Sequence, residues 1–152
     1  MPSTPNKEGR KPSILDRLID PYSAGTAARP WYTLQQTLDV LRRDLENLLN
    51  AKRAIDGPPG LAKSIYCHGL PDLSNFTTET EDDRKALARL LDQTILAHEP
   101  RLRDVRTTME VDQNTHGKRT VFRINAVLAV EPFDQVSFQT VLDLTTGHYI
   151  VS

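Results

Sequence analysis

The sequence predicts an α+β fold, with two to three helices packed on a small, mainly antiparallel sheet of three to four strands in a single domain. Two patterns carry this prediction. Leucines recur at helical spacing in the first two thirds of the chain, and from residue 105 onward apolar and polar residues alternate with a period of two. Helices followed by strands are typical of an α+β layer arrangement. A chain of 152 residues is long enough for one such domain, which buries about two thirds of its unfolded surface.

Residues 1–30 are expected to lie outside this domain. Residues 1–12 hold Pro, Ser, Lys and Gly without apolar periodicity, which predicts a disordered tail. Within residues 13–30, Ser13 and Asp16 can cap a short helix that ends at Pro21, and the residues after it have the composition of a linker. A helix of about two turns is not stable alone, so it must pack on the domain or on a partner. The domain itself is expected over residues 31–152.

Two longer helices are predicted inside the domain. Thr33 and Gln36 form a capping box, and an apolar stripe follows at helical spacing, made by Leu34, Leu38, Leu41, Leu45, Leu48 and Leu49. The turn residues of "DGPPG" (56–60) are expected to end this helix. The next helix opens at Thr80, with Asp83 three residues later, and ends near His98, because the residue before Pro100 is disfavoured in the helical conformation.

Three alternating segments and a short final one predict the strands. Their inward-facing residues are Val105, Thr107, Met109 and Val111, then Phe122, Ile124, Ala126, Leu128 and Val130, then Val136, Phe138, Thr140, Leu142 and Leu144. The final segment is "HYIVS". A small sheet whose chain ends on a strand offers an edge, and sheet edges recruit strands from partners.

The composition argues against several classes of partner and indicates a cellular compartment. Lys and Arg total 19 against 20 for Asp and Glu, so a net charge of −1 gives no reason to expect nucleic acid or an anionic membrane as the main partner. Cys67 is the one cysteine, so no intrachain disulfide is predicted and a reducing compartment is favoured. No apolar run approaches the roughly 20 residues of a membrane helix. These features together predict a cytoplasmic protein.

No catalytic residue, metal site or cofactor is predicted. Cys67 and His68 are adjacent and face apart in an extended chain, whereas a nucleophile and its base meet in space. The histidines are scattered without metal-ligand spacing. Gly57 and Gly60 are not followed by the Lys-Ser or Lys-Thr of a phosphate loop. The sequence therefore favours an interaction protein over an enzyme.

Glu99 is the residue most in need of a partner. The end of a helix carries partial negative charge, and Pro100 stops the helix there. If the chain is extended, Glu99, Arg101 and Arg103 share one side and lie at the rim of the buried face. They could form an intrachain salt bridge or bind another chain. A catalytic acid is the weakest alternative, because it needs a raised pKa, an adjacent arginine has the opposite effect, and a glycosidase needs a second carboxylate about 5–10 Å away.

Four segments in order carry a resemblance to a known family: "SILDRLID", "LRRDLENLLNAKR", "SIYCHGLPDL" and "HEPRL". From about Ser13 to the end, the chain resembles the TssE family of type VI secretion system baseplate proteins. This family is part of the phage-baseplate wedge family that was once labelled lysozyme-like. Members more often read Asn-Thr-Arg after the leucine-rich helix, so Ala51 and Lys52 depart slightly from the pattern. The Glu-Pro-Arg triplet at Glu99–Arg101 is the most specific element.

The resemblance implies a structural role rather than catalysis. It implies a hetero-oligomeric complex with the wedge proteins TssF and TssG, beneath a contractile sheath whose first ring docks by strand sharing. It also implies assembly contacts at Glu99, Pro100 and Arg101, to which the expected geometry adds Arg103. The alternatives are a baseplate wedge protein of a phage or tailocin, a peptidoglycan-hydrolysing muramidase, and a scaffold in which Glu99 and Arg101 only hold the fold together.

Overall fold

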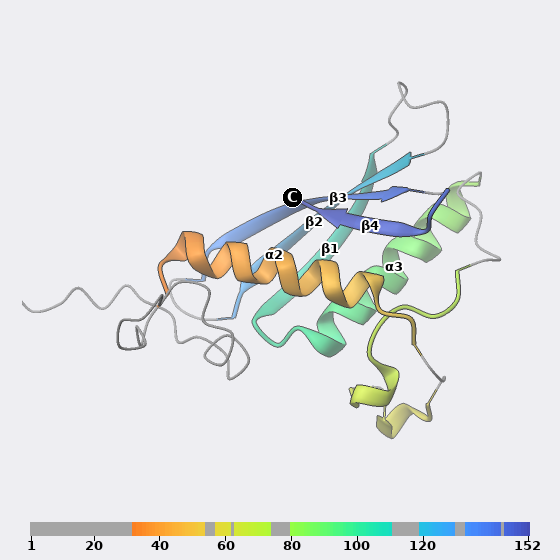
Figure 1. Cartoon of the computed structure of the whole chain (residues 1–152), viewed down its shortest axis with the longest axis horizontal. Coiled ribbons are helices and arrows are strands. Elements are labelled where there is room, and N and C mark those ends of the chain that lie inside the picture. The colour runs from red at the N-terminus through yellow and green to blue at the C-terminus, as the bar shows by residue number, and fades with distance from the viewer. Residues whose placement is uncertain are drawn as a thin grey trace, which may run out of the picture. The chain divides into compact units, whose positions relative to one another are not determined.

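Helices precede strands along the whole described chain. The computed structural model describes residues 32–53, 57–61, 63–73, 80–110, 119–129, 133–143 and 145–152. The α-helices are α2 (Leu34–Asn50) and α3 (Glu81–His98), with two short 3-10 helices, η1 (Pro59–Leu61) and η2 (Ile65–Cys67), between them. The strands are β1 (Leu102–Glu110), β2 (Arg119–Leu128), β3 (Gln135–Asp143) and β4 (His148–Val151) (Figure 1). The α+β prediction is therefore confirmed.

The chain divides into two units inside α2. Residues up to Arg43 belong to the first unit, and Asp44–Ser152 form the second, which contains the last turns of α2, all of α3 and the sheet. The predicted tail, short helix and linker over residues 1–30 lie outside the described residues. No helix in the described ranges is both long and apolar enough to cross a membrane.

Helix α2 begins where the sequence predicts and ends earlier. The backbone N–H of Gln36 donates to Thr33 Oγ1 at 3.2 Å, and that of Thr33 donates to Gln36 Oε1 at 3.0 Å, which confirms the capping box. The helix ends at Asn50, so the prediction that "DGPPG" ends it was wrong. Leu34, expected in the buried stripe, is 41% exposed.

A backbone bridge explains the early end of α2. Leu70 N donates to Ala51 O at 2.9 Å, and Arg53 N donates to Leu70 O at 2.7 Å. Gly69 has a φ of +101°, and a Cβ at this position would lie 2.2 Å from Ala51 O. Only glycine allows so close an approach of the two backbones. The chain after Asn50 is thus held by a contact with a loop distant in sequence, which local turn signals do not reveal.

Helix α3 has the predicted bounds. Thr80 Oγ1 accepts a hydrogen bond from Asp83 N at 3.1 Å and donates to Asp83 Oδ2 at 2.6 Å. The helix ends at His98, directly before Glu99 and Pro100. Its buried apolar side chains are those of Leu87, Leu91 and Ile95. Both ends of this helix are therefore fixed by the residues that predicted them.

The sheet is an antiparallel meander in the order β1-β2-β3-β4. Its inner face carries the buried residues Val105, Phe122, Ile124, Leu128, Phe138 and Leu142. Helix α3 runs alongside β1, and the chain ends in β4 at the opposite edge of the sheet (Figure 1). The outer face is largely polar, with Arg106 opposite Asn125 and Asn125 opposite Ser137.

A β-bulge interrupts β1. Arg103 pairs with Val127, but the next paired residue is Arg106, opposite Asn125. Between them lies Asp104, which has a φ of +52°. The extra residue shifts the alternation, so Leu102 is buried and Arg103 is exposed. The expectation that Arg103 shares the core-facing side of Val105 was therefore wrong. Residues two apart share a side only in an uninterrupted strand, and the bulge interrupts β1 between these two residues.

The edge of the last strand was expected to be open to a partner, but its outward N–H groups already have hydrogen-bond partners. The amide N–H groups of Tyr149 and Val151 donate to side chains of α2. At the other edge, Thr107 N donates to Asp92 Oδ1 of α3 at 2.7 Å. Burial raises the pKa of Asp92, although its hydrogen bonds with Thr107 partly offset this. Side chains of both helices thus occupy edge positions of the sheet.

Candidate functional site

The turn after α3 places Glu99 inside the protein and Pro100 at its surface. Glu99 N still donates to Ile95 O at 2.8 Å, and Leu102 N donates to Glu99 O at 3.2 Å. Glu99 is 5% exposed, whereas Pro100 is exposed. The proline thus ends the helix at the point where the carboxylate must turn inward.

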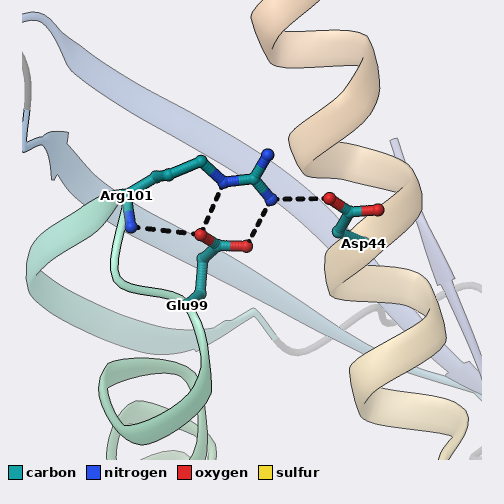
Figure 2. Close-up of polar contacts among 3 residues, drawn as sticks. All are labelled: Asp44, Glu99 and Arg101. Carbon is teal, nitrogen blue, oxygen red and sulfur yellow. Dashed lines mark hydrogen bonds and ion pairs between the residues drawn. The ribbon is translucent and has the colours of Figure 1, made fainter. Parts of the chain in front are cut away.

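Arg101 satisfies the Glu99 carboxylate through three hydrogen bonds. Its backbone N–H and its Nε donate to Glu99 Oε1 at 3.1 and 2.7 Å, and its Nη2 donates to Glu99 Oε2 at 2.6 Å. The guanidinium and the carboxylate therefore meet side by side, in the two-pronged geometry that makes such pairs strong (Figure 2). The intrachain salt bridge considered from the sequence is present.

Asp44 completes an ion triad that the sequence did not reveal. The same Nη2 of Arg101 donates to Asp44 Oδ2 at 2.6 Å, so the guanidinium lies between two carboxylates (Figure 2). Asp44 comes from α2, 57 residues before Arg101. Its side chain is 20% exposed and that of Arg101 is 25% exposed. We call Asp44, Glu99 and Arg101 the ion triad; it joins the last turns of α2 to the turn between α3 and β1.

The two carboxylates hold Arg101 in its charged form. Burial by itself would lower the pKa of Arg101, but the hydrogen bonds and charges of Glu99, and then of Asp44, raise it above its ordinary value. Removing one partner from such a buried pair costs about 3–5 kcal/mol, because it leaves the other charge uncompensated. The triad therefore holds the end of α2 to the turn before β1, and removing one of its members should lower the free energy of unfolding.

Arg103 lies in a different environment from Arg101. Its guanidinium carbon sits 4.3 Å from the centre of the Phe133 ring, a cation–π contact. Phe133 is 48% exposed, and Arg103 is exposed as well. The four residues expected to form one site thus separate into a buried acid, its guanidinium partner, and two surface residues, Pro100 and Arg103.

The geometry around Glu99 does not suit a general acid. A second carboxylate, that of Asp44, is nearby, but the Arg101 guanidinium lies between the two and bonds to both. The guanidinium therefore occupies the space between the two carboxylates in which a glycosidase holds the bond that it cleaves. A cavity of about 330 Å³ in the same unit lies among Leu49, Leu87, Leu142 and Tyr149, and Glu99 does not line it.

The cysteine and histidines form packing contacts in the described structure. His98 Nε2 lies 3.0 Å from the backbone oxygen of Cys67, and the rings of His68 and His98 are 5.1 Å apart in an edge-on arrangement. Burial lowers the pKa of His98, and the neighbouring His68 lowers it further. Among the residues that the structure describes, no three His, Cys, Asp or Glu side chains group as metal ligands would.

Comparison with known proteins identifies the family. Residues 35–132 match the family model of "Baseplate wedge protein gp25". A chain in the solved structure of "The baseplate complex from the type VI secretion system" has a similar fold, with a TM-score of 0.50 and 19% sequence identity over 76% of this chain and 94% of that chain. No curated protein matches. Three of the four segments behind the sequence resemblance lie in the matched range, so that resemblance is confirmed. The chain belongs to the family of baseplate wedge protein gp25.

Proposed function

We propose that this protein is a non-catalytic structural subunit of a type VI secretion system baseplate. In this proposal it joins the wedge proteins TssF and TssG and provides the docking base for the contractile sheath. The observation that carries the proposal is the family match over residues 35–132. The fold similarity to a chain of a type VI secretion baseplate, which covers 94% of that chain, supports this system over other contractile machines.

The ion triad argues against a role in hydrolysis. Its carboxylates and guanidinium satisfy one another, so they serve cohesion between elements of the fold. We propose that the protein is not an enzyme. Purified protein incubated with peptidoglycan, beside the Glu99→Gln variant, tests this directly: release of sugar fragments by the wild type and not by the variant would establish a muramidase.

We propose that the Glu-Pro-Arg region contacts the wedge proteins through its exposed members. Pro100 and Arg103 lie at the surface, and a quarter of the Arg101 side chain is exposed. Glu99 is buried and would act indirectly, by fixing the position of Arg101. An exposed arginine is a favourable contact residue because it can form several hydrogen bonds. A rigid proline turn is favourable because it loses little backbone freedom on binding.

A co-purification experiment tests this contact. Tagged wild type is compared with Arg103→Ala, and with Arg106→Ala as a matched control, since Arg106 is another exposed arginine of β1. We expect Arg103→Ala to recover less TssF and TssG while its melting temperature falls by at most a few degrees, and Arg106→Ala to behave like the wild type. Equal recovery by all three proteins would remove Arg103 from the interface.

We propose that the sheath docks along β1. A hollow of about 400 Å³ lies beside this strand, lined by Thr107, Thr108 and Met109 and by Glu81, Arg84, Lys85 and Ala88 of α3. Thr107 N–H points outward to Asp92, and strand residues two apart point the same way, so Met109 N–H also points outward. An added strand would pair there. Met109→Pro removes this donor and should lower sheath binding while TssF and TssG binding persists.

We also propose a cytoplasmic location, which the single cysteine and the likeness to a secretion baseplate chain support. The same family likeness would hold for a wedge protein of a phage or tailocin. The genes beside this one distinguish the cases: genes for TssF and TssG support the secretion system, and genes for tail fibres or capsid would overturn it.

A further inference from the structure

Two side chains of α2 occupy the outward edge of β4. Tyr149 N donates to Asn50 Oδ1 at 2.8 Å, and Asn50 Nδ2 donates back to Tyr149 O at 2.8 Å. Val151 N donates to Glu46 Oε2 at 3.3 Å. Asn50 Nδ2 also donates to Glu46 O at 2.9 Å, which holds the amide in place on its own helix. We call Glu46 and Asn50 the edge clasp.

The edge clasp makes the hydrogen bonds that a further strand would make. In an antiparallel pair, one residue gives and receives a backbone hydrogen bond with the residue opposite it. The Asn50 side chain supplies one acceptor and one donor to Tyr149 in this way. The next outward N–H, two residues on at Val151, is satisfied by Glu46. An incoming strand would have to displace these side chains before it could pair with β4.

The side chains of β4 explain why this edge needs protection. Ile150 is 55% exposed, and it ends a row of apolar residues that crosses the outer face from Val121 through Val141. A short strand with open backbone groups and an exposed isoleucine pairs readily with another such strand. Proline and charged Lys or Arg side chains often prevent pairing at sheet edges, but the four residues of β4 include none of these.

We propose that the edge clasp prevents β4 from pairing with β4 of a second copy of this chain. Such pairing would be antiparallel and two-fold symmetric, because the same four residues meet on both sides. It would join two four-stranded sheets into one and bring the two Ile150 side chains onto one face. This inference goes beyond the proposed function, since it concerns copies of this chain and not the baseplate partners.

Two substitutions of Asn50 test the clasp in the full-length chain. Asn50→Ala removes all three side-chain hydrogen bonds, and Asn50→Leu keeps a similar size but has neither the donor nor the acceptor. Asn47→Ala, at an exposed asparagine of the same helix, is the matched control. We expect the Tyr149 amide to exchange with solvent deuterium about tenfold faster in both Asn50 variants, the effect of losing one hydrogen bond. Analytical ultracentrifugation should show dimers that increase with concentration, with the control monomeric.

A second substitution identifies the surface that pairs. Ile150→Lys places a charge on the edge strand, so the Asn50→Ala, Ile150→Lys double variant should be monomeric while its Tyr149 amide still exchanges fast. Dimers that persist in the double variant would overturn the proposal, because association would then use another surface. Fast exchange without dimers, or unchanged exchange, would overturn it as well. If Asn50→Ala does not fold, the same outcomes are read from Asn50→Leu.

Discussion

Arg101 and Arg103 are two residues apart, yet their surroundings differ in every respect that matters for function. Arg101 lies between two carboxylates, one of them 57 residues earlier in the chain. Arg103 is exposed and contacts a half-exposed phenylalanine. The turn at Pro100 brings the first guanidinium into the ion triad, and the bulge at Asp104 keeps the second at the surface. Identical side chains therefore serve stability in one place and remain available for recognition in the other.

Arg101→Ala should be the most damaging change. It leaves the Glu99 carboxylate buried without its counter-ion, at a cost of about 3 kcal/mol. For a domain of this size the melting temperature should fall by about 6–12 °C. A melting temperature within a degree of the wild type would show that the triad contributes little to the fold, and that the Glu-Pro-Arg triplet serves recognition alone.

Arg101→Lys should have an intermediate effect. Lysine keeps the charge near both carboxylates but cannot donate the paired hydrogen bonds that Nε and Nη2 make to Glu99. We expect a loss of about 1–2 kcal/mol, from chemical denaturation. If lysine restored full stability, charge alone would account for the triad, and the planar geometry in Figure 2 would be incidental.

Arg103→Ala should have the smallest effect on the fold. An exposed cation–π contact contributes about 0.5–1 kcal/mol, so the melting temperature should fall by at most a few degrees. Phe133→Ala in the same background should add almost nothing, since the contact is already gone. A loss as large as that of Arg101→Ala would show that the two arginines do not differ in role.

The sequence predicted those features whose causes are local. The capping box at Thr33, the start of α3 at Thr80 and its end before Pro100 all depend on residues within one turn of each other. The alternating segments predicted the strands for the same reason, since one face of each strand is buried. The salt bridge between Glu99 and Arg101 was among the alternatives because the two residues are close in sequence.

Features that depend on distant contacts were missed. Asp44 gave no signal, because an aspartate among other charged residues on the polar side of a helix looks solvated. The early end of α2 depends on Leu70, and the closure of the β4 edge depends on Asn50. The bulge was missed because the alternation of buried and exposed residues is regular from Val105 onward, so Asp104 looks like an ordinary outward-facing residue of the strand. Each of these requires knowing which segments meet in space.

The contacts of α2 bear on how the chain folds as it is made. Each strand pairs with the next one along the chain, so the sheet can form from hairpins in order. Helix α2 instead waits for partners 57, 99 and 105 residues downstream, the last of them at the C-terminal strand. Until that strand has been made, Glu46 and Asn50 of α2 lack their hydrogen-bond partners in β4. Completion of this unit thus requires that β4 has been made.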